Sequence, residues 1–228
     1  MSDTEYRLGL IREILGRLPR SRFESVVDYG CADGSILRSV VNEVQAKRGK
    51  GIDLRARESQ GESITLNRGN FLNMQVNEQY DLVISNQVFE HIYEPWLPQY
   101  FHVLKAGCAQ GGVILMSTPN RWRPRNIIRV LTFRSPYMMQ ANKNVPPEEF
   151  LGHHRECSYR ELKSILMDYF QPPGWKVKIL RTVPRLIDSQ ARWVANILVY
   201  FSLWPLWRLT VRSASQDHYV VIEHHPTD

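Results

Sequence analysis

A glycine-containing turn directly follows an apolar run near the start of the chain. Residues 26–34 read VVDYGCADG, so that Asp28 ends the run and Gly30 and Gly34 frame the turn. Glycine adopts positive φ angles at little cost and lets the backbone approach a ligand closely. A buried strand, a tight turn and a helix in this order form a nucleotide-cofactor site at the carboxyl end of a parallel strand.

The spacing of the glycines and the acids around them indicate which kind of cofactor fits. A dinucleotide site has the pattern G-x-G-x-x-G, whose second glycine contacts a pyrophosphate. Here the pattern is D-x-G-x-x-x-G, and Asp28 and Asp33 would repel a pyrophosphate. Acidic groups suit a cofactor with a cationic amino group, so the turn favours S-adenosylmethionine over NAD.

Later blocks of the sequence supply groups that would hold the rest of such a cofactor. Asp53 ends a short expected strand, where a carboxylate can accept hydrogen bonds from both ribose hydroxyls. Asn70 can hydrogen-bond the edge of an adenine ring, and Phe71 or Leu72 can pack against its face. A fourth block over 80–92 reads as a strand that runs into a helix.

These four blocks, in this order and spacing, resemble class I S-adenosylmethionine-dependent methyltransferases over residues 20–120. The resemblance implies an enzyme that uses S-adenosyl-L-methionine and releases S-adenosyl-L-homocysteine. Tyr29 and Ala32 depart from the family's usual residues in the turn, but Ala32 is small enough to preserve it. The residues expected to bind the cofactor are Asp28, Tyr29, Gly30, Cys31, Gly34, Asp53, Leu54, Asn70, Phe71, Leu72 and Asn86.

The order of the expected elements predicts an α/β fold. Helices are expected over 4–18, 34–46, 95–105, 125–133 and 158–170, and strands over 24–29, 49–53, 62–67, 80–85, 111–117, 174–180 and 219–223. Alternating strands and helices predict a doubly wound, seven-stranded, mostly parallel sheet with helices on both faces, a Rossmann-like methyltransferase fold. We expect one domain over 1–228, with a leading helix over 4–18, a substrate or lid insertion over 119–157 and an apolar helical insertion over 186–212.

Histidines are the candidates for activating the methyl acceptor. If the acceptor is a hydroxyl, its proton must be removed by a base with a pKa near neutrality, which suits histidine. His91 follows the strand at 80–85, and His153 precedes the expected helix at 158–170. Both are candidate catalytic residues.

The segment Ser117–Arg121 together with the segment around His153 resembles a branch of small bacterial methyltransferases. In that branch a Ser/Thr-Pro-Asn segment and a His-x-Arg-Glu segment recur, and the match favours His153 over His154. Many members are associated with the assembly of surface glycans or lipid-linked saccharides. Others methylate ubiquinone precursors or small metabolites.

Basic residues gather around the same segments. The net charge is +6, and arginines crowd the regions 121–134 and 181–212. They form either a solvated surface or a site for an anionic partner, such as a phosphorylated substrate or acidic lipid headgroups. The residues expected to contact the substrate are Asn120, Arg121, Arg123 and Arg155. For Arg155 and Glu156, a structural ion pair with each other is the alternative.

An apolar, aromatic-rich segment spans residues 193–207 and is interrupted by Pro205. It is shorter than the roughly 20 residues that cross a bilayer. It is either a helix buried against the sheet or a dimer partner, or an interfacial segment. In the second case residues 193–212 would make a peripheral membrane contact, with tryptophans at headgroup depth and arginines on phosphates.

Several classes of protein are disfavoured. The first residues are polar and resemble no signal peptide, and three cysteines fit a reducing compartment, so we expect a cytoplasmic protein, either free or membrane-associated. No Cys/His spacing suggests a zinc site, so no metal is expected. The block after Ser85 lacks the Asn/Asp-Pro-Pro-aromatic pattern typical of nucleobase methylation, which argues against nucleic acid as a partner.

The hypothesis that follows is a methyltransferase that O-methylates a hydroxyl of a glycan or lipid-linked saccharide. One alternative is a methyltransferase of a soluble metabolite or quinone precursor. A second alternative is a non-catalytic, cofactor-binding or scaffold protein that kept the fold. The acceptor and the oligomeric state are left open by the sequence.

Overall fold

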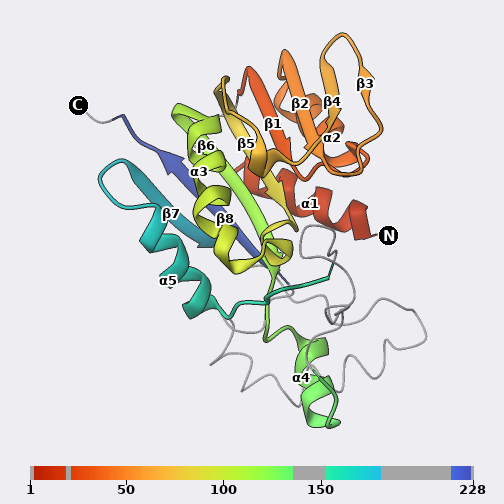
Figure 1. The fold of residues 1–228 in the computed structure, drawn as a ribbon, viewed down its shortest axis with the longest axis vertical. Helices are drawn as coiled ribbons and strands as arrows, with labels where there is room; N and C mark the ends of the chain where they lie inside the picture. The colour runs from red at the N-terminus through yellow and green to blue at the C-terminus, as the bar shows by residue number, and fades with distance from the viewer. Residues whose placement is uncertain (1–2, 19–21, 136–151, 181–216, 227–228) are drawn as a thin grey trace.

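A mostly parallel β-sheet forms the centre of the protein (Figure 1). The computed structural model describes residues 3–18, 22–135, 152–180 and 217–226. The described strands are β1 (Ser25–Tyr29), β2 (Arg48–Asp53), β3 (Ser59–Gln60), β4 (Ile64–Arg68), β5 (Tyr80–Asn86), β6 (Cys108–Pro119), β7 (Trp175–Leu180) and β8 (Asp217–His224). They lie in the order β3-β4-β2-β1-β5-β6-β8-β7.

The strand order reverses in the middle of the sheet. From β1 the chain builds outward through β2 and β4, and β5 then returns to the other side of β1 and is followed by β6. All of these pairings are parallel, whereas β8 pairs antiparallel with both β6 and β7. Parallel sheets bind ligands at the carboxyl ends of the strands where the order reverses, here between β1 and β5.

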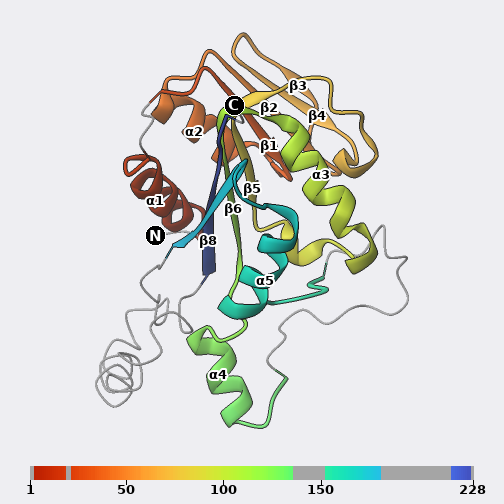
Figure 2. The same ribbon diagram turned by 90° about the vertical axis from the view of Figure 1, so that its left-hand side faces the viewer.

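Helices cover both faces of the sheet. The described helices are α1 (Asp3–Leu15), α2 (Ser35–Val44), α3 (Leu97–Gly107), α4 (Pro124–Leu131) and α5 (Tyr159–Tyr169). Figure 2 shows α1 and α2 on one face, α3 and α5 on the other, and α4 beyond the end of the strands.

Neighbouring residues of a strand belong to two separate hydrophobic cores. Val26 packs in the core under α1 and α2, and Val27 packs in the core under α3 and α5. Successive side chains of a strand point to opposite faces, so a strand that is buried on both faces is apolar throughout. This is why the apolar run that ends at Asp28 forms a central strand.

The predicted fold class is confirmed, and the helices and strands lie close to their expected ranges. The expected strand number was one too small, because β3 has only two residues and pairs antiparallel with β4 at the edge of the sheet. A strand of this length shows no periodicity in the sequence. A capping box between Ser158 and Glu161 begins α5.

Two expected insertions lie wholly or partly outside the described residues. The range 186–212 lies outside them, as do residues 136–151 of the expected substrate insertion. The single-domain organisation and the environment of residues 193–207 therefore stay predictions. In the described part of the chain, no helix has the length and apolar character needed to cross a membrane.

Candidate functional site

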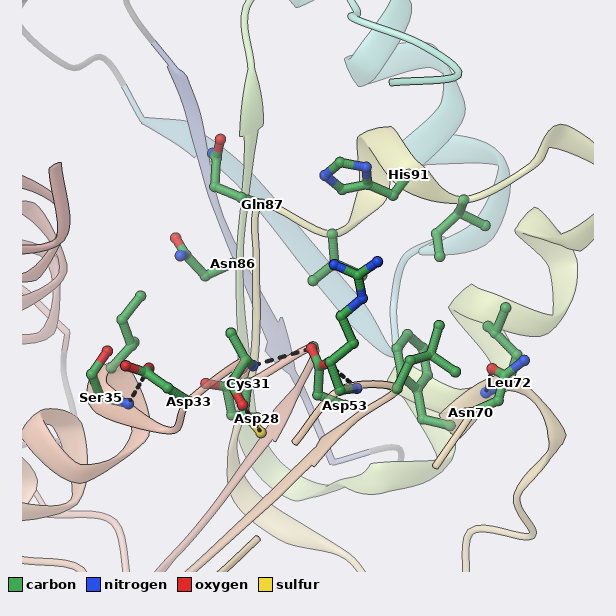
Figure 3. A pocket seen from close by; sticks show the side chains of 18 of the residues that line it. Asp28, Cys31, Asp33, Ser35, Asp53, Asn70, Leu72, Asn86, Gln87 and His91 are labelled. Atoms are coloured by element: carbon green, nitrogen blue, oxygen red, sulfur yellow. Dashed lines mark hydrogen bonds between the residues drawn. The ribbon is translucent and has the colours of Figure 1, made fainter. Parts of the chain in front are cut away.

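A cavity of about 740 Å³ opens at the carboxyl ends of β1, β2 and β5 (Figure 3). Its walls come from α1, from the segments that follow these three strands, and from the segment around Asn70. The lining residues are Arg7, Asp28, Gly30, Cys31, Ala32, Asp33, Ser35, Ile36, Asp53, Leu54, Arg55, Arg57, Asn70, Phe71, Leu72, Asn86, Gln87, Val88, His91, Ile92 and Trp96. The cavity therefore lies at the point where the strand order reverses.

Acidic side chains line the part of the cavity above β1 and β2. Asp28 is buried, and its Oδ1 atom has no hydrogen-bond partner among the described residues. Burial, and then repulsion by Asp53, raise the pKa of Asp28 to about 8. Because a buried carboxylate is costly unless it is paired, this position favours a ligand that brings a cationic group.

The carboxylate of Asp53 is held in place at the end of β2. Its Oδ2 accepts a hydrogen bond from the backbone N–H of Ala32 at 3.1 Å, and its Oδ1 accepts one from the N–H of Arg55 at 2.7 Å. The first of these bonds connects the tips of β1 and β2. Since a carboxylate has about four acceptor positions, Asp53 can still accept hydrogen bonds from ligand hydroxyls.

The turn after β1 depends on a residue without a side chain. Gly30 has a φ of 89°, and a Cβ at this position would lie 2.2 Å from Cγ2 of Val88. Close packing on Val88 thus brings the β1 turn against the segment that follows β5. On the other side of the turn, Asp33 Oδ1 accepts a hydrogen bond from the N–H of Ser35, and the hydrogen bonds from Ser35 lower the pKa of Asp33.

Asn70, Phe71 and Leu72 form a compact turn at the far side of the Asp53 carboxylate. The side-chain oxygen of Asn70 accepts a hydrogen bond from the N–H of Leu72 at 3.1 Å and begins a short 3-10 turn over Phe71–Asn73. Phe71 and Leu72 are largely buried, yet both line the cavity. This arrangement presents an apolar wall and an amide group side by side.

The segment after β5 lines the opposite part of the cavity. Asn86 is oriented by Ser117, whose Oγ donates a hydrogen bond to its Oδ1 at 2.6 Å. The Nδ1 atom of His91 lies 3.0 Å from the carbonyl oxygen of Gly152. A carbonyl only accepts, so Nδ1 carries the proton and Nε2 is the unprotonated nitrogen of a neutral His91.

His153, the second histidine candidate, lies directly beside His91. The centroids of the two rings are 5.0 Å apart. Glu90, which the sequence reasoning did not single out, lies next to them with its Oε1 4.0 Å from the Nε2 of His91. Glu90 is 1% exposed, and burial raises its pKa to about 8. Its position next to His91 in the sequence is the signal that could have identified it.

A buried hydrogen-bond network centred on Glu156 orients His153. Glu156 Oε1 accepts from Arg123 Nη2 at 2.7 Å and lies 2.9 Å from the Nδ1 of His153. Its Oε2 accepts from Nδ2 of Asn126 at 2.6 Å. Among the described contacts Glu156 therefore pairs with Arg123 rather than with Arg155, whose guanidinium lies over the Phe89 ring at 5.3 Å.

The structure brings most of the expected cofactor residues together around the cavity. Tyr29 and Gly34 do not line it. Tyr29 packs in the core, with its ring 5.3 Å from that of Phe71, because it is the last residue of β1 and points to the face covered by α3. Gly34 adopts a positive φ and precedes α2.

None of the four expected substrate residues lines the cavity, and all four have identified contacts within the protein. Arg121 donates to the carbonyl oxygen of Glu156 and pairs with Glu161, and Arg123 is part of the Glu156 network. Asn120 is fully buried, and its Oδ1 accepts from the N–H of Trp122. The contacts of Arg121 and Arg123 with Glu156 connect the segment after β6 with the segment that contains His153.

Other arginines line the cavity instead. They are Arg7 of α1 and Arg55 and Arg57, which follow the tip of β2. The sequence analysis did not single them out, although Arg55 and Arg57 lie directly after Asp53. The cavity thus has carboxylates, guanidinium groups and an imidazole on its wall, a combination that suits a zwitterionic cofactor and an anionic second ligand.

Solved structures with a similar fold include an S-adenosylmethionine-dependent methyltransferase. An S-adenosylmethionine-dependent methyltransferase from Archaeoglobus fulgidus matches with a TM-score of 0.59 and 17% identity, over 96% of this chain and 93% of that one. A complex of DhpI with SAM and HEP matches with a TM-score of 0.59 and 13% identity, over 97% and 86%. A complex between the Haloferax volcanii Trm112 methyltransferase activator and a methyltransferase matches with a TM-score of 0.64 and 15% identity, over 97% and 92%. The chain therefore has the Rossmann-like methyltransferase fold.

Residues 4–169 match the family described as methyltransferase domain, and the chain belongs to this family. The enzyme class expected from the sequence, a methyltransferase, is thereby confirmed. No curated protein matches the chain.

Proposed function

We propose that this protein is an S-adenosylmethionine-dependent O-methyltransferase that acts on a hydroxyl of an anionic glycan or lipid-linked saccharide. One observation carries the proposal. The acids above β1 and β2, of which Asp28 is buried, and His91 after β5 line the same cavity. The acids suit the cationic methyl donor, and His91 suits a hydroxyl that must lose its proton.

The methyl donor is S-adenosylmethionine, and the residues of the cavity fit it. The buried Oδ1 of Asp28, which lacks a hydrogen-bond partner among the described residues, can receive the cationic amino group of the donor. Asp53 is placed for the ribose hydroxyls, and Asn70 with Phe71 and Leu72 for the adenine. When bound, S-adenosylmethionine supplies a methyl group on a cationic sulfur, which the acceptor oxygen displaces in line to leave S-adenosylhomocysteine.

His91 can prepare the acceptor for this displacement. The hydrogen bond from its Nδ1 to the Gly152 carbonyl holds the ring and selects the tautomer with an unprotonated Nε2. That atom can take the proton of the hydroxyl as the new oxygen–carbon bond forms. The ring centroid of His153 lies 5.0 Å from that of His91, so that the two rings pack edge to face.

The arginines on the cavity wall support an anionic acceptor. We assign a phosphate or carboxylate of the acceptor to Arg7, Arg55 and Arg57, which line the cavity. This assignment replaces the expected role of Arg121 and Arg123, since the guanidinium groups of both are hydrogen-bonded within the protein. Arginine binds such groups well because its planar fork matches two oxygens at once.

The proposal that the acceptor lies at a membrane surface also rests on the sequence of the apolar segment 193–207 and its flanking arginines. A soluble metabolite or quinone precursor is the alternative acceptor. Flotation with vesicles that contain anionic lipid separates the two. Wild-type protein that stays unbound to such vesicles would remove the membrane-side version and leave the soluble one.

Calorimetry with S-adenosylmethionine and S-adenosylhomocysteine tests the cofactor assignment. We expect micromolar binding of both, and at least ten-fold weaker binding by Asp53→Ala, equivalent to about 1.4 kcal/mol. Glu62→Ala, which changes an exposed acid away from the cavity, is the control and should bind as the wild type does. A folded wild type that binds neither compound would favour the non-catalytic scaffold.

Transfer of a tritiated methyl group tests the acceptor class. Sugars with and without a phosphate are compared as acceptors, and we expect transfer only to the phosphorylated members. His91→Gln should slow the transfer at least a hundred-fold, the range of general-base catalysis, while cofactor affinity is unchanged. Equal transfer to neutral and phosphorylated sugars would refute the role of the arginines.

A further inference from the structure

Glu90, His91 and His153 bring three potential metal ligands together. One ring nitrogen of each histidine and one carboxylate oxygen of Glu90 lie within 4.8 Å of one another. Within the part of the chain that the structure describes, this is the one group of three or more such side chains with this geometry. His91 lines the cofactor cavity, so the cluster lies at the edge of the space expected to hold the acceptor.

Both histidines are held in the tautomer that metal binding requires. The Nδ1 of His91 is bonded to the Gly152 carbonyl, and the Nδ1 of His153 is bonded to the Glu156 carboxylate, at 3.0 and 2.9 Å. With the proton on Nδ1, Nε2 is the unprotonated nitrogen of each ring. Histidine ligands in metal sites almost always use one nitrogen for the ion and donate the other N–H to a carbonyl or carboxylate. Here Gly152 supplies the carbonyl and Glu156 supplies the carboxylate.

A hydrogen bond also orients the carboxylate of Glu90. Thr118 Oγ1 donates a hydrogen bond to its Oε2 at 3.2 Å, while its Oε1 is the atom nearest the Nε2 of His91, at 4.0 Å. The side chain is 1% exposed. A buried carboxylate is normally paired with a cation or coordinates a metal. Arg7 is a cation that acts on this carboxylate, but burial outweighs its effect and raises the pKa of Glu90 to about 8.

We propose that Glu90, His91 and His153 bind one divalent transition-metal ion at the acceptor side of the cavity. Two imidazoles and one carboxylate form a ligand set for zinc, manganese or iron that leaves positions open for other oxygens. Neighbouring ligands of such an ion lie about 3 Å apart, given bonds of about 2.1 Å. The two histidines, which are 33% and 12% exposed at their side chains, would therefore move toward Glu90 by about 1 Å on binding.

This site deepens the proposed O-methyltransferase function, and the catalytic role of the ion rests on that function. An acceptor hydroxyl that binds an open position of the ion would have its pKa lowered, as water does on zinc. Its proton would pass to solvent through the open cavity, and the resulting oxygen would use its electron pair for the new bond to carbon. His91 would thus promote loss of the hydroxyl proton in either state, by holding the ion when the ion is bound and by accepting the proton itself when it is not.

Titration of tag-free, chelator-treated protein with Mn²⁺ tests the site. Calorimetry should find one Mn²⁺ per chain for the wild type, and at least ten-fold weaker binding for Glu90→Gln and for His153→Gln. Glu94→Gln and His102→Gln change an exposed residue of each type and serve as matched controls. Both controls should bind as the wild type does. Circular dichroism and S-adenosylhomocysteine binding report whether each variant is folded.

A second measurement needs no variant. Pulsed electron paramagnetic resonance of the Mn²⁺ complex should detect nitrogen couplings from imidazole ligands. Absence of Mn²⁺ binding, equal binding by wild type, Glu90→Gln and His153→Gln, or a spectrum without nitrogen couplings would each overturn the metal site. A wild type that binds S-adenosylhomocysteine but no Mn²⁺ would refute the metal site alone. The reverse result would refute the cofactor assignment alone.

Discussion

Replacement of Asp28 by asparagine should stabilise the protein without its cofactor. Burial and the charge of Asp53 raise the pKa of Asp28 to about 8, from 3.8 in an unfolded chain. The folded state therefore binds a proton that the unfolded state has released, and the free energy of unfolding falls as pH rises between these two values. Asparagine resembles the protonated acid and is free of this penalty.

The expected size of the effect follows from the same two pKa values. Each pKa unit corresponds to about 1.4 kcal/mol, so the variant should gain about 4 kcal/mol of stability at pH 7. Only below about pH 3 do both states bind the proton, and there the gain should vanish. In the proposed function, this penalty is the cost of an ionised Asp28 that pairs with the cationic group of the cofactor. The stabilised variant should accordingly bind S-adenosylmethionine at least ten-fold more weakly.

Urea unfolding of cofactor-free protein between pH 4.5 and pH 7.5 measures this difference, since other titrating groups cancel between the two proteins. Asp33→Asn is the control, because Asp33 lies in the same turn but its pKa is lowered by hydrogen bonds from Ser35. Its stability contribution is present above the unfolded pKa and lost only in acid, so its difference from wild type should be flat over this range. A pH-independent difference for Asp28→Asn, or a loss of stability at pH 7, would refute the reasoning.

Two further substitutions test the packing that supports the site, with urea unfolding as the measurement. Gly30→Ala adds a Cβ that would lie 2.2 Å from a neighbouring side chain at a φ of 89°, and should cost about 3 kcal/mol. Gly111→Ala, at a φ of 74° with open space around it, isolates the backbone contribution of about 1 kcal/mol, and equal losses would contradict the packing argument. Arg123→Met leaves Glu156 buried without its cation and should cost about 3–5 kcal/mol. Arg121→Met removes a partly exposed ion pair and should cost less than about 1 kcal/mol, and a similar loss in both variants would show that the Glu156 network is not special.

Much of the fold and of the cofactor half of the site was predictable from the sequence. The apolar run before Asp28, the glycines of the turn and the acid Asp53 are local patterns. Each specifies a local conformation, and the carboxyl ends of neighbouring parallel strands necessarily meet. The same reasoning assigned Asp53 and Asn70 to one cofactor, and the structure finds both on the cavity wall.

Basic residues show where local patterns are insufficient. A cluster of arginines in the sequence indicates positive charge but does not show where each guanidinium points. Arg123 is buried against Glu156, whereas Arg7 of α1 lines the cavity. Both outcomes depend on how distant segments pack.

The acceptor side was decided by the tertiary structure. Glu90 and His91 follow β5, and His153 lies far along the chain, so no spacing pattern links them. They meet because the segment after Gly152 runs along the turn at Glu90, whose carbonyl oxygen accepts a hydrogen bond from the N–H of His154 at 2.8 Å. The sequence by itself determined the sheet, the turn and the acids that suit the methyl donor, because short-range periodicity and backbone freedom specify them. Only the packing of remote segments, which no local pattern encodes, placed two histidines and a buried glutamate where a hydroxyl could be activated.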